Sequence, residues 1–150
     1  MYIAQFTIDI LTNLIERNAH SERVMSYGAE NTKNEDLELF FKNVGRQRDS
    51  FRRDLAEAMK DYGGFPINTG DMEDRLKEMW LMVQERLYLN DDSSYVETAF
   101  EAEKRALENY QEAVSDDQLN PGLKSLLSRH LESFFSTTQQ LEIWIQTLKK

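Results

Sequence analysis

The stretch from Ser94 to Val114 places a carboxylate where an apolar side chain is due. Its apolar residues recur every three or four positions, a spacing that predicts one stripe along a helix. Glu103 lies in the middle of that stripe. A carboxylate on the buried face of a helix costs several kcal/mol unless it is paired, hydrogen-bonded or bound to a metal. The partner of Glu103 therefore decides what the chain can do. The apolar members of the stripe are Val96, Ala99, Phe100, Ala106, Leu107, Tyr110, Ala113 and Val114.

The rest of the chain favours long helices in one domain. Its 150 residues predict a single domain over 1–150 with a core of its own. Only two prolines and six glycines interrupt it, and no segment has the alternation typical of a strand. The absence of cysteine excludes disulfides and thiolate metal sites, and it agrees with a reducing compartment.

The charge balance argues against two classes of partner. Lys and Arg number 18 while Asp and Glu number 27, so the formal net charge is −9. Nucleic acid and anionic lipid should both repel such a chain. No apolar run approaches the roughly 20 residues of a membrane span, and residues 1–20 lack the pattern of a signal peptide. We therefore expect a cytoplasmic protein with no nucleic-acid or membrane partner.

Apolar periodicity predicts four long helices and one shorter helix. They run from about Gln5 to Glu30, from a cap at Thr32 to about Tyr62, from about Met72 to Tyr88, from Ser94 to about Ser115, and from about Gly122 to Leu148.

Capping signals set these boundaries. Thr32 with Glu35, and Ser94 with Glu97, have the spacing of a capping box. The other predicted caps are Asp71 at the start of the shorter helix, Asn120 followed by Pro121 at the start of the last, and the stop at Gly63, Gly64, Phe65 and Pro66.

Short turns join the first two long helices and the last two, so each pair is predicted to form an antiparallel hairpin. The segment 65–93 is long enough to cross back along the bundle. The predicted fold is all-α: a ferritin-like four-helix bundle of two hairpins, with a short helix in the long crossover. An up-down bundle with a fifth helix packed outside is the competing prediction.

Polar residues interrupt every long apolar stripe near its middle. Hairpin partners that lie equally far from their turn lie at the same height, so these interruptions should meet inside the bundle. The spacing predicts one core polar layer, or two adjacent ones, made of Asn18, Glu22, Gln47, Arg48, Glu103 and His130.

Two explanations for such a layer stay open. In the first, Arg48 pairs with Glu103 or Glu22 and His130 is hydrogen-bonded nearby. In the second, carboxylates bind metal, as in bundles that supply glutamates and Glu-x-x-His motifs. The sequence contains no Glu-x-x-His, and an arginine in the layer would repel a divalent ion. We therefore expect no metal or other cofactor. A degenerate iron or manganese site would use Glu22, Glu103 and His130.

Several segments resemble a family of uncharacterised bacterial ferritin-like four-helix proteins, catalogued as a domain of unknown function. The resemblance covers nearly the whole chain. The matching segments are LTNLIE from Leu11 to Glu16, GAE with NEDLELFF between Gly28 and Phe41, RQRDSFRRDL from Arg46 to Leu55, the YGGFP hinge, Trp80, and EAEKRALENYQEA from Glu101 to Ala113.

The resemblance implies a ferritin-like bundle that pairs as a homodimer in the bacterial cytoplasm. It implies no established activity, and a link to stress response follows only by similarity to other ferritin-like proteins. Glu103 corresponds to the helix glutamate of the family. Gln47 stands where relatives often have glutamate, Thr138 where they often have histidine, and His20 where an acidic residue is common. These departures argue against a metal site carried over from the fold.

Remaining candidates are weaker. Glu16 and His20, one turn apart, could share a surface metal ion, but such a pair is usually a solvated contact. Four aromatic residues lie beyond the core stripes and indicate either a dimer surface or packing of the crossover helix: Tyr27, Trp80, Phe135 and Trp144.

The favoured hypothesis is a non-enzymatic bundle that associates with itself or with a protein partner. A metal-binding, oxygen- or peroxide-handling protein of the ferritin type is the alternative. A small-molecule binder that uses the gap around the polar layer ranks third.

Overall fold

The computed structural model describes residues 2–63 and 70–150, with the side chains of 5–63 and 71–150. Within these ranges the chain is all-α and has no strand. The helices are α1 (Tyr2–Asn31), α2 (Glu35–Lys60), α3 (Gly70–Leu87), α4 (Asp92–Val114) and α5 (Pro121–Lys149).

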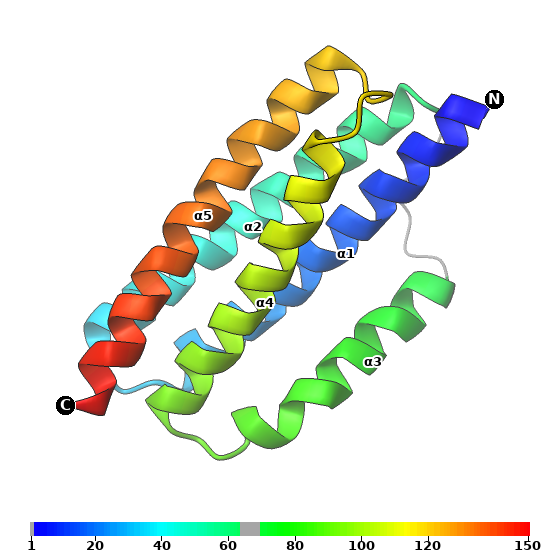
Figure 1. Cartoon of the computed structure of the whole chain (residues 1–150). Coiled ribbons are helices and arrows are strands. Elements are labelled where there is room, and N and C mark those ends of the chain that lie inside the picture. The colour runs from blue at the N-terminus through cyan, green and yellow to red at the C-terminus, as the bar shows by residue number, and fades with distance from the viewer. Residues whose placement is uncertain (1, 64–69) are drawn as a thin grey trace.

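Four of the helices form two hairpins, and α3 lies outside them (Figure 1). α1 packs along α2, and α4 packs along α5, as the short turns predicted. The hairpins meet chiefly where α1 contacts α4, whereas α2 and α5 approach each other more loosely. α3 lies outside, against α1 and α4. Because α3 runs back along the bundle between them, α2 and α4 point the same way. No helix among the described residues is long and apolar enough to cross a membrane.

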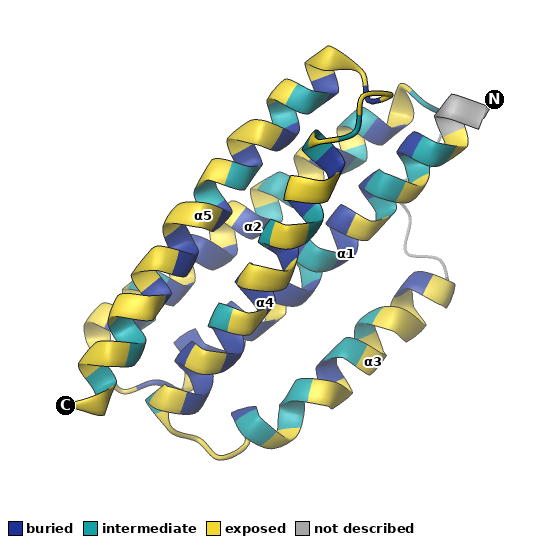
Figure 2. Ribbon diagram, in the orientation of Figure 1, coloured by how far each residue is buried: buried dark blue, intermediate teal, exposed yellow. Residues whose placement is uncertain are grey.

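The apolar core is divided into two clusters along the length of the bundle. One contains Leu55, Tyr110 and Leu127, all fully buried. The other contains Phe41 and Val96, also fully buried. α3 contributes to both, since Met72 belongs to the first cluster while Trp80 and Leu87 belong to the second. In Figure 2 the residues coloured as buried recur along the side of each bundle helix that faces its neighbours, as a 3.6-residue period requires.

Two predicted helix starts are wrong by a few residues. Asn34, not Thr32, caps α2, because its side chain accepts a hydrogen bond from the Leu37 amide. Thr32 lies in the turn, where its hydroxyl donates to Asp92 at 2.7 Å and so ties the α1–α2 turn to the start of α4. α2 and α4 each begin where an Asx side chain reaches a free amide.

The same shift occurs at α4. Asp91 caps this helix by accepting a 2.7 Å hydrogen bond from the Ser94 amide, so Ser94 lies inside the helix and not at its cap. Asn120 caps α5 and Pro121 is its first residue, which confirms that prediction. Asp71 lies in the first turn of α3.

Glycine serves two distinct purposes near α2. Gly63 follows its end with φ of +79°, a left-handed conformation that other residues adopt at a cost. The rest of the predicted stop, 64–66, lies outside the described residues. Gly28 allows close approach, because a Cβ there would lie 2.5 Å from the ring of Phe41. α1 and α2 can therefore pack tightly at the end where their turn begins.

Candidate functional site

An ion pair between α2 and α4 occupies the centre of the bundle. Arg48 and Glu103 are both 0% exposed. Nε of Arg48 lies 2.9 Å from Oε2 of Glu103, and one terminal nitrogen lies 2.5 Å from Oε1. This two-pronged geometry suits the planar guanidinium fork. Glu103 therefore faces a cation supplied by the protein itself.

Hydroxyl groups complete the shell of this pair. The hydroxyl of Ser21 on α1 donates to Oε2 of Glu103 at 2.5 Å. Ser133 and Thr137 on α5 each accept from the guanidinium of Arg48 at 3.1 Å. All four bundle helices thus meet at one cluster, which satisfies both charges.

The guanidinium also contacts aromatic faces. The central carbon of Arg48 lies 3.7 Å from the ring centroid of Phe134 and 5.1 Å from that of Phe51. Such cation–π contacts compensate part of the lost hydration of a buried arginine. The pair is thus enclosed by aromatic and hydroxyl groups and is closed off from solvent.

A hydrogen-bonded chain runs beside the ion pair from the core to the surface. The amide of Asn18 donates to the hydroxyl of Tyr110 at 2.9 Å. That hydroxyl lies 2.8 Å from Nδ1 of His130, and Nε2 of His130 lies 3.1 Å from a carboxylate oxygen of Asp54. The arrangement is consistent with a neutral imidazole that accepts from Tyr110 and donates to Asp54. Three buried groups are thereby linked to a half-exposed carboxylate.

Burial favours the neutral forms of the His130 and Tyr110 side chains in this hydrogen-bonded series. Desolvation lowers the pKa of His130, and the hydrogen bond that its ring donates to Asp54 opposes that change. Desolvation also raises the pKa of the Tyr110 hydroxyl, although its bond to Asn18 opposes the rise. Tyr110 is therefore a neutral phenol, and His130 favours its neutral form.

Two buried oxygen atoms have no hydrogen-bond partner among the described residues: Oδ1 of Asn18 and Oγ1 of Thr98. Asn18 is committed through its nitrogen, which donates both to Tyr110 and to the carbonyl of Leu14. An unmet buried oxygen weakens the fold unless water reaches it.

Two of the six residues predicted for the layer lie outside it. Glu22 is partly exposed and its carboxylate lies 3.6 Å from Nε of Arg52, on the outer side of the α1–α2 hairpin. Gln47 is exposed and reaches the layer only by accepting from Ser133 at 3.1 Å. Spacing along a helix predicted their height correctly, but these side chains point outward from it. The structure brings together Asn18, Arg48, Glu103 and His130.

The residues named for a degenerate metal site do not converge. Glu22 pairs with Arg52, Glu103 with Arg48, and the ring of His130 with Asp54 and Tyr110. Across the side chains that the structure describes, no group of three or more His, Cys, Asp and Glu residues could hold a metal ion. Arg48 holds its positive charge beside Glu103, where a bound cation would otherwise have to lie.

The second candidate pair, Glu16 and His20, is buried and not solvated as predicted. Glu16 is 4% exposed and His20 is 8% exposed, because α3 covers this side of α1. Arg75 of α3 holds Glu16 with contacts of 2.9 Å from Nε and 2.6 Å from a terminal nitrogen. Sequence reasoning failed here because nothing in α1 itself indicates which helix will cover it.

His20 lies in a positive environment under α3. Burial, together with the charges of Arg17 and Arg23 on the adjacent turns, lowers its pKa to about 4. The guanidinium of Arg23 is itself held over the ring of Trp80, 4.0 Å from its centroid. This histidine is therefore neutral at physiological pH.

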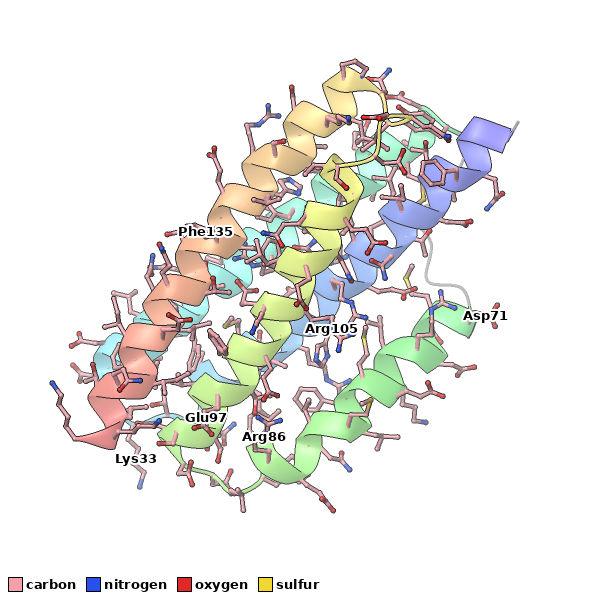
Figure 3. The ribbon with its side chains drawn as sticks, viewed as in Figure 1. Lys33, Asp71, Arg86, Glu97, Arg105 and Phe135 are labelled. Carbon is pink, nitrogen blue, oxygen red and sulfur yellow. The ribbon has the colours of Figure 1, made fainter. Side chains whose placement is uncertain are left out.

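The aromatic residues beyond the core stripes divide between packing and surface. Trp80 is buried and meets the ring of Tyr27 edge-on, with centroids 5.8 Å apart. Trp144 packs near Phe40. Phe135 is 51% exposed, and Figure 3 shows it on the outer side of α5. Packing of the crossover helix thus accounts for Trp80 and Tyr27, while Phe135 stays a surface residue.

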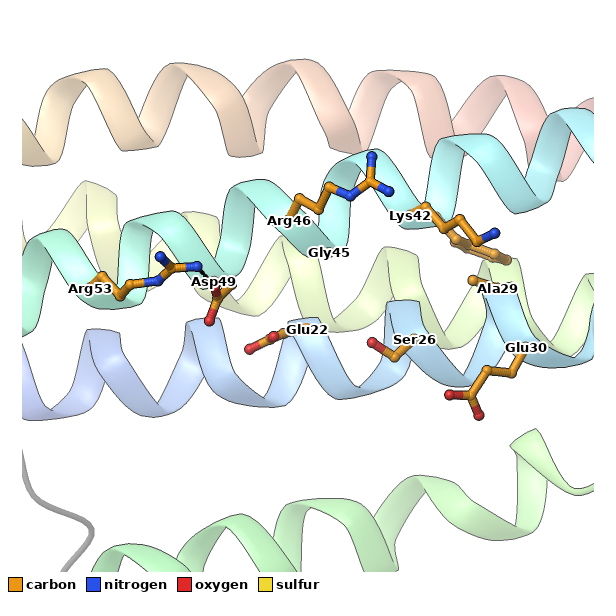
Figure 4. Close-up of a pocket in the computed structure, with 10 residues that line it drawn as sticks. Glu22, Ser26, Ala29, Glu30, Lys42, Gly45, Arg46, Asp49 and Arg53 are labelled. Atoms are coloured by element: carbon orange, nitrogen blue, oxygen red, sulfur yellow. Dashed lines mark hydrogen bonds and ion pairs between the residues drawn. The ribbon is translucent and has the colours of Figure 1, made fainter.

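An open groove of about 380 Å³ lies along the outer side of the α1–α2 hairpin (Figure 4). Asp49, which pairs with Arg53, lies on one wall, and the bare backbone of Gly45 lies at its centre. Because carboxylates and cations alternate along the groove, it has no single-sign field for a charged ligand. The other lining residues are Glu22, Ser26, Ala29, Glu30, Phe41, Lys42 and Arg46.

Five residues of the layer were not predicted as members. Ser21, Ser133 and Thr137 are small polar residues that fit either face of a helix, so their type gave no signal. Tyr110 was assigned to the apolar stripe, although a buried tyrosine hydroxyl normally requires a partner. Asp54 lies two turns after Gln47 in sequence, and its position near His130 depends on how α2 and α5 pack.

A family model matches residues 6–116, which include most of α1, all of α2 to α4 and both members of the Arg48–Glu103 pair, and stop short of α5. That model is described as a domain of unknown function, DUF2383. The chain belongs to this family. None of the curated proteins and none of the solved structures compared with the chain matches it. Membership in DUF2383 thus agrees with the expected domain-of-unknown-function family and names no activity.

Proposed function

We propose that this DUF2383 protein is a non-enzymatic ferritin-like bundle that acts through association, as a homodimer. The observation that carries the proposal is the Arg48–Glu103 pair. Both carboxylate oxygens of Glu103 already accept hydrogen bonds from Arg48, and Oε2 also accepts from Ser21. The carboxylate that a metalloprotein of this class would use is therefore occupied by protein donors.

The connectivity supports the ferritin-like assignment. Two antiparallel hairpins are joined by a long segment that contains α3, and α1 packs beside α4. In metal-binding bundles with this connectivity, side chains from four helices converge on ions in the core. Here side chains of four helices converge in the same way on the Arg48–Glu103 pair, in which the guanidinium is the charge-equivalent of a bound cation.

Charge segregation favours a particular side for self-association. α2 carries six acidic and six basic residues, and α5 carries two acidic and three basic ones. In contrast, α4 carries six acidic residues against two basic ones. Two copies of a chain with net charge −9 repel least where α2 and α5 face each other. Leu39 and Ile143 on these two helices are 58% and 66% exposed and supply apolar contact area.

Sedimentation velocity of the purified chain tests the association. We expect a dimer that Ile143→Glu weakens by at least about tenfold, because the change buries a charge in the contact. Met82→Glu on α3 is the matched control, since Met82 is 84% exposed on the opposite side. A monomer at all concentrations would contradict the proposal, as would equal weakening by both changes.

Metal analysis of protein purified without chelator tests the non-enzymatic part. We expect substoichiometric iron, manganese and zinc, with no change between the unaltered chain and Glu103→Gln. Stoichiometric metal that is lost in Glu103→Gln would instead favour the metal-binding alternative, since it would require Arg48 to release the carboxylate.

A further inference from the structure

The outer face of α3 carries a second apolar stripe that the bundle leaves uncovered. Its inward residues are buried, but Leu81, Met82, Tyr88 and Leu89 are 53%, 84%, 54% and 67% exposed. These four residues are called the α3 patch below. Leu81 and Met82 are followed seven residues later by Tyr88 and Leu89, so the patch lies on one side of α3 and of the turn after Leu87. The ring of Tyr88 also packs against Tyr27 of α1, with centroids 5.9 Å apart, and keeps its other side toward solvent. A solvent-facing stripe of this kind is typical of an interaction surface.

Two free carboxylates lie on the same face. Glu85 is exposed and falls one turn from all four members of the patch, and Glu78 precedes Leu81 and Met82 by one turn. Neither has an ion-pair partner among the described side chains. The nearest arginine is already committed, since Arg86 holds Glu101 of α4 at 2.7 Å and lies on the side of α3 toward α4 (Figure 3).

The helices behind the patch strengthen the negative field. α3 carries five acidic residues against three basic ones, and α4 and α1 are both acidic as well. A second copy docked on the patch by two-fold symmetry would bring Glu85 toward Glu85, and an anionic membrane would be repelled. A ligand with an apolar stripe flanked by positive charge would be attracted to these carboxylates and not repelled by them.

We propose that the α3 patch binds an amphipathic helix of a partner protein whose apolar stripe is flanked by lysine or arginine. From Leu81 to Leu89 the patch extends about 12 Å along the axis, at about 1.5 Å per residue. Two turns of a partner helix, with anchors at i, i+3 or i+4, and i+7, match that length. Glu78 and Glu85 pair with the flanking cations and fix the orientation of the helix.

Three synthetic helices of about 18 residues provide the probes, a length that supports a helix in solution. The first places leucines at the anchor spacing and lysines beside them. The second replaces each lysine with glutamate, and the third scrambles the first while keeping its composition. Fluorescence anisotropy against the full chain should show binding of the first, with affinity at least about tenfold above the other two.

Surface variants locate the site. Met82→Ser with Leu89→Ser should weaken binding of the basic helix at least about tenfold, because both anchors lose their apolar contacts. Glu78→Lys with Glu85→Lys should exchange the preference, so that the acidic helix binds better than the basic one. Phe135→Ser on α5, at a residue 51% exposed, is the matched control and should leave binding unchanged. Circular dichroism checks that each variant keeps its helices.

Three outcomes would overturn the inference. Equal binding of the scrambled basic peptide would mean general attraction to an acidic chain. Equal weakening by Phe135→Ser would place the contact elsewhere. Loss of dimer in Met82→Ser with Leu89→Ser, without loss of peptide binding, would make a second copy the occupant of the patch. Failure of the dimer proposal alone, shown by a monomeric chain that still binds the basic helix, would leave this inference standing.

Discussion

The central layer and the contact under α3 use the same chemistry with different access to solvent. In both regions a two-pronged arginine joins a carboxylate on another helix, and a histidine lies nearby. The shortest nitrogen–oxygen distances are 2.5 Å for Arg48 with Glu103 and 2.6 Å for Arg75 with Glu16. The side chains of the first pair are both 0% exposed, whereas Arg75 is 48% exposed. Although the two pairs have similar geometry, removing one partner should cost more free energy of unfolding in the buried pair than in the half-exposed one.

The histidines in these two regions, His130 and His20, differ in how well their surroundings stabilise a positive charge on the ring. His130 has Tyr110 on one ring nitrogen and Asp54 on the other, so its surroundings support a positive charge in part. His20 has no hydrogen-bond partner among the described residues and lies between Arg17 and Arg23. The half-exposed pair, Arg75 with Glu16, thus lies near His20, which is the histidine whose surroundings oppose a positive charge more strongly. Burial of a histidine in this bundle therefore does not by itself decide whether nearby groups can stabilise its charged form.

The largest expected effect is loss of one partner in the central pair. Glu103→Ala should lower the free energy of unfolding by about 3–5 kcal/mol, because Arg48 would be left charged and buried. Urea unfolding followed by circular dichroism measures the change. A loss below about 0.5 kcal/mol would mean that Arg48 can reach solvent or another anion.

The double change Arg48→Met with Glu103→Leu is the matched control. It removes both charges and keeps apolar volume, so most of the lost stability should return. A double variant as unstable as Glu103→Ala would show that shape, and not uncompensated charge, explains the loss.

Acidification should act next, through His20. Its pKa of about 4 in the fold lies below the value of about 6.5 for an unfolded chain, so the unfolded state binds more protons between these values. Stability from this group is present above pH 6.5 and decreases as the pH falls, by up to about 3 kcal/mol. Comparing the unfolding free energy of the unaltered chain and His20→Leu at pH 7 and pH 4.5 isolates the contribution. An identical pH dependence in both chains would contradict it.

Breaking the half-exposed pair should cost less and act locally. Arg75→Met should lower global stability by about 0.5–1 kcal/mol, since solvent screens the pair and can hydrate Glu16 once α3 moves. Hydrogen exchange should accelerate in α3 and not in α2 or α5. Lys77→Met, an exposed change on the same helix, is the control. Faster exchange throughout the bundle would mean that α3 belongs to the central cooperative unit.

The smallest effect is expected at the surface end of the hydrogen-bonded chain. Asp54 is 46% exposed, so Asp54→Asn should change stability by less than about 0.5 kcal/mol. It should lower the pKa of His130 further, because the carboxylate is what raises it. Titration followed by NMR of the imidazole protons measures the change, with Glu57→Gln on the same helix as control. A higher pKa in Asp54→Asn would contradict the assigned arrangement.

Much of the layer could be predicted because a charged residue inside an apolar stripe has few solutions. Glu103, Arg48, Asn18 and His130 were each identified as polar interruptions, and the structure buries all four. Pairing between Glu103 and Arg48 was one of the alternatives that the sequence left open. Glu22 was misplaced because a shift of about 100° per residue separates an inward side chain from an outward one.

Helix starts and small polar partners were harder to predict. The two capping boxes failed because the Asx side chains nearby, Asn34 and Asp91, reached the free amides instead. Ser21 and Thr137 could not be recognised as partners of the central pair, since a short hydroxyl side chain does not reveal which face of its helix will be covered. Their roles depend on the distance between helices, which a single helix does not determine.

The sequence by itself determined the number of long helices, their hairpin pairing and the polar residues that must meet inside, because apolar periodicity and the cost of burying charge are local properties. Only the tertiary structure decided that α3 covers Glu16 and His20, that a chain of hydrogen bonds leads from Asn18 to Asp54, and that the α3 patch stays open. These features arise where surfaces of different helices meet, and such contacts depend on packing that no one stretch of sequence contains.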